Sequence, residues 1–303
     1  MNTDHIRENP WIGRIAVTTV AATFFLLILG GIVSSKGVGM AVPDWPTTFG
    51  YNMFTYPLSK MVGGIFYEHS HRLIGSLVGF LTIGLSIAII WKDNRRWLKV
   101  LSVVALIAVI AQGIMGGMRV VEISKAFAVA HGAFAHAFFA LVVSIAFFLS
   151  NFWKDLPTGN NIMEASQLRR FSIITTIMIY SQLVVGAIYR HTGNWFWIHM
   201  LLALIVTTTI FLLMDSVNKK IGNITFLRRT SITLSALILL QLFSGLGAYM
   251  TKLISPDPLT ASAIVVTITL IHVLSGSLIF SSSVLLTIGI VKCTKESLEL
   301  ATE

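Results

Sequence analysis

The sequence predicts an all-α integral membrane protein with eight transmembrane helices, arranged as two pseudo-symmetric four-helix bundles with both termini cytoplasmic. Three observations lead to this prediction: the composition, the spacing of apolar segments and the repetition of motifs along the chain. Apolar residues make up 55% of the 303 residues and charged residues only 12%, whereas soluble domains carry roughly 25% charged residues. A lipid bilayer is therefore the expected environment of the chain.

Eight apolar segments are each long enough to cross the ~30 Å hydrocarbon core of a bilayer as a helix. They lie at residues 14–34, 71–91, 98–118, 128–149, 170–189, 197–214, 231–250 and 264–288. The first is expected to be a retained helix, because it is longer than the core of a signal peptide and lacks a small-residue cleavage site.

Lysine and arginine residues are distributed unevenly between the two sides of these segments. Fifteen fall on the side of the termini and seven on the other side. The positive-inside rule then predicts cytoplasmic termini and a multi-pass protein of the inner (cytoplasmic) cell membrane. The net charge of +9 is dispersed through short loops, so no nucleic-acid partner is expected. Cys293, the single cysteine, allows no intrachain disulfide.

The second half of the chain repeats features of the first. Residues 29–33 resemble residues 185–189, and Gln112, Gly113 and Gly116 have counterparts in Gln241, Gly245 and Gly247. This duplication predicts an amino-terminal four-helix unit at residues 1–155 and a carboxy-terminal one at residues 156–303. Small residues at such spacing commonly allow transmembrane helices to pack closely, and we assign that role to Gly113, Gly116 and Gly117.

Four histidines occur near the same end of every even-numbered apolar segment. They are His71, His131, His199 and His272, and the offsets within the two matched pairs are 128 and 141 residues. A buried imidazole is costly in lipid unless it has a partner, so these side chains are interpreted as axial ligands of the iron of two haems. Zinc or non-haem iron fits less well, because the helices offer no nearby cysteine or second carboxylate.

An acidic residue accompanies the first of these histidines. Glu68 lies three residues before His71, so the two share one face of a helix, while His69 cannot share that face. A carboxyl group is thus placed beside whatever His71 binds, where it could accept a proton or stabilise positive charge. The alternative is a carboxylate that caps the second helix. We expect His69 to form a structural hydrogen bond.

These residues resemble the haem A synthase family. The resemblance rests on Glu68-x-x-His71-Arg72, on residues 39–46 and 52–54, on His131-Gly132 with Phe138-Phe139, on residues 190–193, and on His272-Val273 with Gly276. It extends over essentially the whole chain. It implies oxidation of a methyl group of haem O to a formyl group, which gives haem A for the terminal oxidase.

The resemblance also implies roles for individual residues. His71 and His131 would bind the substrate haem, with Glu68 as the catalytic carboxylate, and His199 and His272 would ligate a resident haem b that passes electrons. Implied partners are the haem O synthase (protohaem farnesyltransferase), terminal oxidase assembly factors and an unidentified electron donor or acceptor. A homo-oligomer is left open. The four histidines would lie toward the outer leaflet.

The chain departs from the family in two respects. Many members have cysteine pairs in the outer loops, and this chain has none. Members of this loop type often have glutamine where this chain has His136, five residues after His131. A five-residue step turns about 140° around a helix, so His136 cannot replace His131, and a packing role is expected. No role is assigned to His191.

The outer loop at residues 35–70 is long and rich in aromatic residues, which predicts a lid over the substrate haem or, equally, an aromatic belt at the membrane interface. Arg72, Arg119 and Arg190 lie on the side of the membrane that has few basic residues. Guanidinium groups match carboxylate geometry, so these arginines are candidates to pair with haem propionates, with lipid headgroups as the alternative.

Two other functions fit parts of the pattern. A di-haem membrane cytochrome b, carrying electrons between quinol and a partner, would use the same four histidines but needs neither Glu68 nor a lid. A transporter with histidine proton relays would be expected to have paired acids within its spans. The haem A synthase prediction is preferred because it accounts for all these features.

Overall fold

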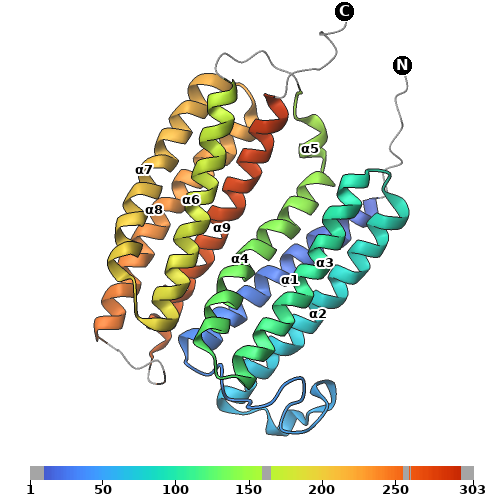
Figure 1. Cartoon of the computed structure of the whole chain (residues 1–303), viewed down its shortest axis with the longest axis vertical. Coiled ribbons are helices and arrows are strands. Elements are labelled where there is room, and N and C mark those ends of the chain that lie inside the picture. Colours follow the sequence, from blue (N-terminus) through green and yellow to red (C-terminus); the bar gives the residue numbers. More distant parts are fainter. Residues whose placement is uncertain (1–9, 159–164, 255–258, 260, 295–303) are drawn as a thin grey trace, which may run out of the picture. The chain divides into compact units, whose positions relative to one another are not determined.

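The computed structural model describes residues 10–158, 165–254, 259 and 261–294, and the regular structure in these residues is helical (Figure 1). Eight helices are long and apolar enough to cross a membrane, which confirms the predicted fold class. They are α1 (Pro10–Ser35), α2 (Gly63–Lys92), α3 (Arg96–Val121), α4 (Lys125–Phe148), α6 (Ala165–Thr192), α7 (Phe196–Ile221), α8 (Thr225–Ile254) and α9 (Ala263–Cys293). Three short helical segments, η1 (Met53–Thr55), η2 (Leu58–Lys60) and α5 (Asn151–Asp155), complete the described elements.

The helices extend beyond the apolar segments from which they were predicted. The largest difference at a functional position is in α2, which begins at Gly63, although the apolar segment begins at residue 71. Glu68, His69, His71 and Arg72 lower the hydropathy of this first part without breaking the helix. The side chains of Glu68, His69 and Arg72 find partners in the protein instead of lying in lipid.

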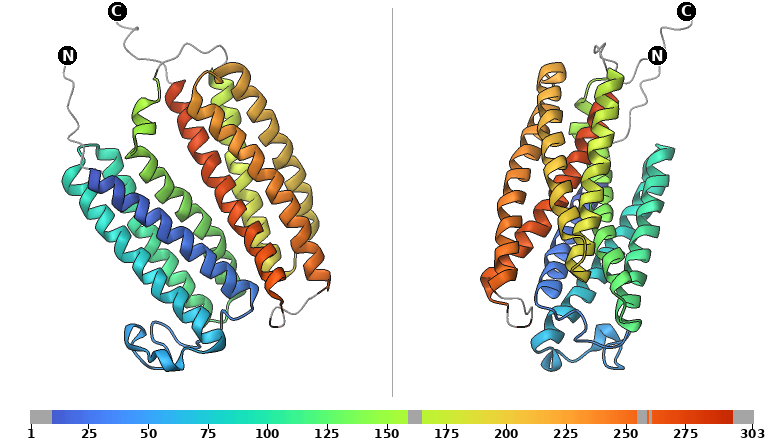
Figure 2. Two further views of the ribbon diagram at one scale, coloured as in Figure 1. Left: turned by 180° about the vertical axis from the view of Figure 1, so that it is seen from behind. Right: turned by 60° about the vertical axis from the view of Figure 1, so that its left-hand side comes forward.

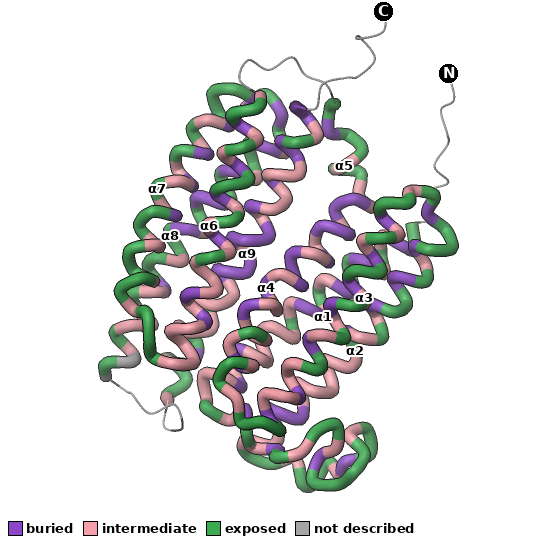
Figure 3. The backbone as a smooth tube through the Cα atoms, viewed as in Figure 1, coloured by how far each residue is buried: buried purple, intermediate pink, exposed green. Residues whose placement is uncertain are grey.

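Burial in these helices follows the pattern of a protein whose solvent is lipid. Large apolar side chains face outward, such as Phe80, which is 63% exposed, and Ile107, which is 62% exposed (Figure 3). Small polar side chains, such as Thr19, Thr82 and Ser102, are fully buried between helices. Small residues let helices approach closely, and hydroxyls bond to nearby carbonyls. Accordingly, the Ser86 hydroxyl on α2 donates to the Ser102 carbonyl on α3 at 2.9 Å.

The chain divides into two compact units. Residues 1–149 with 244–274 form one, and residues 150–243 with 275–303 form the other. In the first unit α1 packs against α2 and α4, and α3 packs against α2 and α4, which makes a four-helix bundle (Figure 2). In the second unit α6 packs against α7. The predicted functional boundary between residues 155 and 156, the pseudo-symmetry and the cytoplasmic side of the termini stay predictions. Residues 1–9 and 295–303 lie outside the described residues.

An ion pair holds the turn between α2 and α3 at one end of the first bundle. The Asp93 carboxylate accepts from the Arg95 guanidinium at 2.7 Å, and Arg95 Nη1 also donates to the Phe148 carbonyl at the end of α4 at 2.9 Å. Burial alone would raise the pKa of Asp93, but the hydrogen bonds and charge of Arg95 outweigh it and hold that pKa below its ordinary value. The long loop between α1 and α2 lies at the opposite end of this bundle (Figure 1).

Candidate haem-binding site

Two of the four histidines face each other inside the first unit. The imidazole rings of His71 on α2 and His131 on α4 have centroids 6.4 Å apart and planes at 86°. Two imidazoles on opposite faces of one iron, with metal–nitrogen distances of about 2 Å, hold their centroids about 6 Å apart. The separation of this pair therefore fits a haem iron bound between them.

The hydrogen bonding of His131 leaves one ring nitrogen available to a metal. Its Nδ1 lies 3.1 Å from the Gln112 carbonyl oxygen on α3, and the Gln112 side-chain amide donates to the His131 carbonyl at 3.3 Å. A carbonyl oxygen only accepts, so Nδ1 carries the proton and Nε2 keeps its lone pair. Metal-binding histidines typically hold their second nitrogen in this way.

His71 lies in similar surroundings on the other side of the pair. Its Nδ1 is buried and makes no regular hydrogen bond, although the Leu26 carbonyl on α1 lies nearby. A buried imidazole without a full set of partners is costly in a membrane protein. Ligation of a metal by this ring would offset part of that cost.

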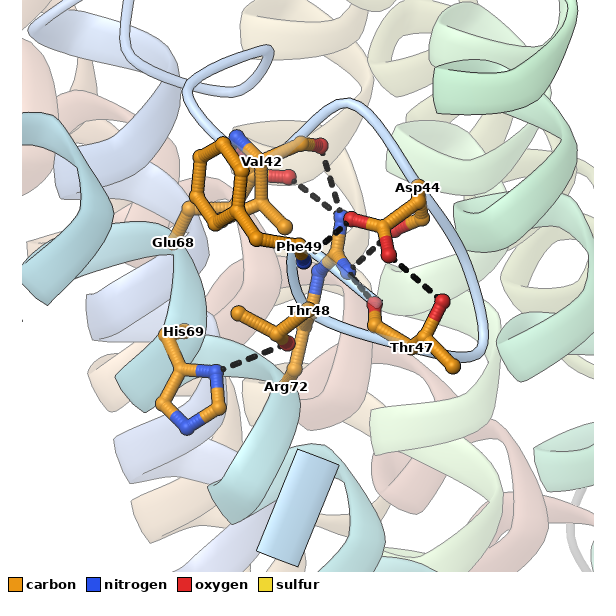
Figure 4. Close-up of polar contacts among 8 residues, drawn as sticks. All are labelled: Val42, Asp44, Thr47, Thr48, Phe49, Glu68, His69 and Arg72. Carbon is orange, nitrogen blue, oxygen red and sulfur yellow. Dashed lines mark hydrogen bonds and ion pairs between the residues drawn. The ribbon is translucent and has the colours of Figure 1, made fainter. Parts of the chain in front are cut away.

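Glu68 lies one helical turn before His71, and its carboxylate points into the loop that follows α1. The side chain is 5% exposed. Oε2 accepts the Val42 backbone N–H at 2.9 Å, and Oε1 accepts the Arg72 guanidinium at 2.9 Å (Figure 4). Both oxygens therefore join α2 to the loop, so the carboxylate anchors the loop rather than the start of α2.

The Arg72 guanidinium binds backbone carbonyls of the same loop. Nη1 donates to the carbonyls of Asp44 at 2.6 Å and Thr47 at 3.0 Å, and Nη2 donates to the Val42 carbonyl at 3.1 Å (Figure 4). With the Glu68 contact, both terminal nitrogens are engaged. In this arrangement the guanidinium faces loop carbonyls, and a propionate would have to displace them.

A tight turn centred on Asp44 shapes the middle of the loop, and sequence reasoning missed it. The Asp44 carboxylate accepts from the Thr47 hydroxyl at 2.5 Å and from the backbone N–H groups of Phe49 at 2.7 Å and Gly50 at 2.8 Å (Figure 4). Burial raises the pKa of Asp44, but these hydrogen bonds outweigh it and the pKa lies below its ordinary value. An aspartate followed by threonine and then glycine is a turn signal that could have predicted this feature.

His69 joins the loop to α2 from the opposite side of the helix to the histidine pair. Its Nδ1 lies 3.1 Å from the Thr48 hydroxyl, and its ring packs 5.1 Å from the Tyr56 ring, centroid to centroid. The side chain is 1% exposed. The structural hydrogen bond expected for His69 is therefore present.

Arg119, in the last turn of α3, is a basic residue close to both histidines of the pair. It lies close enough to interact electrostatically with His71, His131 and Glu68. Its guanidinium packs against Gly39, and the Trp45 ring packs against the neighbouring Gly117. Among the described residues no hydrogen bond to the Arg119 side chain is found. The loop thus reaches the end of α3 beside the histidine pair, while Trp45 itself is 38% exposed.

The other two predicted haem ligands are His199 and His272. His199 on α7 packs against Gly186 of α6 and stacks on Tyr189 with centroids 6.2 Å apart. The Gln182 side-chain amide donates to the His199 carbonyl at 3.0 Å. His272 on α9 packs against Gly245 of α8.

Three further polar residues considered in the sequence have interactions of their own. Arg190 and His191 lie in the last turn of α6, and His136 is buried in α4.

Comparison with known proteins identifies the family. The COX15-CtaA family, described as cytochrome oxidase assembly proteins, matches residues 13–195. This segment contains Glu68, His71 and His131 and ends before His199. The chain is 30% identical over 184 residues to a protein named Heme A synthase from Geobacillus kaustophilus, covering 59% of this chain and 56% of that protein.

Two further relatives have the same name. The chain is 29% identical over 192 residues to one from Bacillus licheniformis, covering 61% of each chain, and 28% identical over 181 residues to one from Alkalihalophilus pseudofirmus, covering 58% of this chain and 59% of that protein. The matches thus span less than two thirds of these relatives. Because the family pattern covers more than half of the chain and contains the histidine pair, the chain belongs to the COX15-CtaA family of cytochrome oxidase assembly proteins.

Proposed function

We propose that this protein is a haem A synthase, an oxidoreductase that converts a methyl group of haem O into the formyl group of haem A for a terminal oxidase. The observation that carries the proposal is the His71–His131 pair, whose rings are 6.4 Å apart and perpendicular. The name Heme A synthase shared by three relatives at 28–30% identity supports the same activity.

The substrate haem O would be held between His71 and His131. The Nδ1 hydrogen bond to the Gln112 carbonyl would keep His131 Nε2 directed at the iron. Arg119 would pair with a propionate, because it is the base beside both histidines and its guanidinium has no hydrogen-bonding partner among the described residues. Arg72 is a weaker candidate than Arg119, since loop carbonyls already bind it.

Conversion of a methyl group to a formyl group adds one oxygen atom, from O2 or water, and removes electrons and protons that side chains alone cannot take up; a bound haem would supply this redox chemistry. The contribution of this chain is to bind, to orient and to accept a proton. Glu68 is the buried carboxylate one turn from His71, and it would be the proton acceptor. The loop anchored by Glu68 and Arg72 would restrict water at the reacting group.

A second, resident haem b would be bound by His199 and His272 and would pass electrons. Each of these imidazoles packs against a glycine of the preceding helix, as His71 and His131 do. The electron donor or acceptor is unidentified. Haem O synthase and terminal oxidase assembly factors are proposed partners, and the proposed location is the inner membrane with the histidine pairs toward the outer leaflet.

The alternative is a di-haem cytochrome b that only carries electrons. In each half of the chain a connection joins the first two helices, and the two connections differ in length. Residues 36–62 join α1 to α2, whereas residues 193–195 join α6 to α7. The longer connection is held by a buried ion pair on α2, between Glu68 and Arg72, whose side chains bind its backbone. An electron carrier needs no such difference, so the synthase is preferred.

Extraction and chromatography of the haems from purified protein separates the two functions. A synthase is expected to yield haem O or its partly oxidised forms beside haem B, and co-expression with haem O synthase in a host without haem A should produce haem A. Two equivalents of haem B, with no haem A formed on co-expression, would contradict the proposal. In the synthase, His199→Ala should deplete haem B while His131→Ala should deplete haem O.

A further inference from the structure

Each of the four histidines packs the same edge of its ring against a glycine of the preceding helix. A Cβ atom built on the glycine would lie 3.0 Å from Cε1 of the histidine for Gly30 with His71, 3.1 Å for Gly116 with His131, 3.0 Å for Gly186 with His199 and 2.8 Å for Gly245 with His272. Such distances are shorter than normal carbon–carbon contacts of about 3.5–4.0 Å. A side chain at any of these glycines would therefore require the imidazole or the helix to shift.

Other glycines on the same helices do not make this contact with a histidine ring. On α3, a Cβ atom at Gly113 would meet nothing within 4 Å, although Gly113 lies one turn before Gly116. Gly79 and Gly84 on α2 are equally open. Close packing of helices through small residues thus does not explain which glycines face the histidines.

A second residue recurs at a constant spacing, four positions before the glycine. Gln112 lies four residues before Gly116, on the same face of α3, and its carbonyl accepts the Nδ1 proton of His131. Leu26 has the same spacing to Gly30, and Gln182 has it to Gly186, where its side chain donates to the His199 carbonyl. For His131 and His199, one turn of the preceding helix therefore supplies both a hydrogen bond to the residue and the space for the Cε1 edge of its ring.

This geometry determines the direction of the metal-facing nitrogen. Cε1 lies between Nδ1 and Nε2, so a methyl group against Cε1 must turn or shift the ring and move both nitrogens. We propose that Gly30, Gly116, Gly186 and Gly245 are positioning residues, which set the orientation of the four imidazoles that would bind haem. The inference rests on the proposed haem-binding function.

The first test reads the orientation of the ligands. In purified protein with its haems, Gly186→Ala should shift the electron paramagnetic resonance g-values and midpoint potential of the resident haem, and Gly116→Ala should do so for the substrate haem. The matched control, Gly113→Ala, should leave both signals at their parent values. Unchanged signals in Gly116→Ala and Gly186→Ala, or equal shifts in Gly113→Ala, would overturn the proposal.

The second test does not depend on haem and so separates this inference from the proposed function. Thermal unfolding of haem-depleted protein is compared for Gly116→Ala, His131→Ala and the double variant. If Gly116 acts through the ring, Gly116→Ala lowers Tm in the His131 background, and this shift disappears in the His131→Ala background, where the ring is gone. An equal shift in both backgrounds would mean that Gly116 serves helix packing alone. If the Gly116→Ala protein accumulates poorly in cells and the double variant with His131→Ala accumulates normally, that result supports the inference in the same way as a restored Tm.

Discussion

Glu68 and Arg72 form a buried ion pair one helical turn apart on α2, with Arg72 Nη2 2.9 Å from Glu68 Oε1. Their side chains are 5% and 9% exposed, so the pair is shielded from water. Together they bind four backbone groups of the loop, at Val42, Asp44 and Thr47. The proposed catalytic carboxylate and the anchor of the loop are thus the same group, and a test of one role must control for the other.

Glu68→Gln should abolish most haem A formation while haem binding persists. The amide has a similar shape but cannot take up a proton, and loss of a proton-transfer group typically costs about 10²–10⁴-fold in rate. Removing one partner of a buried ion pair also costs about 3–5 kcal/mol of stability. The measurement is haem A yield per bound haem O, determined by extraction and chromatography, together with thermal unfolding.

Arg72→Lys is the matched control for this variant. Lysine keeps a positive charge beside Glu68 but cannot reproduce the guanidinium contacts to the three loop carbonyls. It should loosen the loop and preserve the carboxylate, so haem A formation should exceed that of Glu68→Gln at comparable loss of stability. Equal losses of haem A in the two variants would leave Glu68 only its role in anchoring the loop.

Arg119→Gln should weaken haem O binding without altering the ligands. A hydrogen bond to a charged group contributes about 1.5–3 kcal/mol, which corresponds to about tenfold or more in affinity. The control is chemical: parent protein should bind haem O more tightly than its dimethyl ester, which lacks the propionate charges, and Arg119→Gln should bind the two equally. A preference for free haem O that survives in Arg119→Gln would assign propionate binding to another group.

The helices and the histidine pair could be predicted because their signals are local or repeated. Hydropathy identifies a span from its own residues, and a histidine at duplicated positions stands out in an apolar chain. The start of α2 was misplaced because Glu68, His69, His71 and Arg72 are polar, and the partners of Glu68, His69 and Arg72 lie in the loop. Hydropathy alone cannot show that such polar groups have hydrogen-bonding partners within the protein.

The contacts of Arg72 and of Gly116 could not be predicted for two different reasons. Arg72 binds backbone carbonyls, which every residue has, so no sequence pattern indicates them. Gly116 was assigned to helix packing because a glycine signals a close approach without naming the neighbour. The structure identifies that neighbour as His131.

The side of the membrane on which the loop lies can be tested with one engineered cysteine. Ser59 is exposed, so Ser59→Cys in a Cys293→Ser background should react with a membrane-impermeant maleimide in intact cells. This follows from the excess of basic residues on the opposite side of the membrane. Labelling that requires permeabilised cells would place the loop and the His71–His131 pair at the cytoplasmic face.

The Asp44 turn should make the order of the loop sensitive to acid. Its pKa is lowered from 3.8 by hydrogen bonds from Thr47, Phe49 and Gly50 to the carboxylate, in opposition to burial. A carboxyl group whose pKa is lower in the folded state stabilises that state above its unfolded pKa, and this contribution is lost as the pH falls through the folded value. A spin label at Ser59→Cys should therefore become more mobile below about pH 4.

Asp44→Asn isolates the contribution of this turn. It removes the charge and leaves one oxygen where two accepted hydrogen bonds, so the label should be more mobile already at pH 7. Thr55→Val, which alters an exposed hydroxyl of the same loop, should leave the spectrum unchanged. Any transition with pH that remains in Asp44→Asn arises from a group other than Asp44. If the label in Asp44→Asn is no more mobile than in the parent at pH 7, or if Asp44→Asn shows the same transition as the parent, the Asp44 carboxylate does not hold this turn.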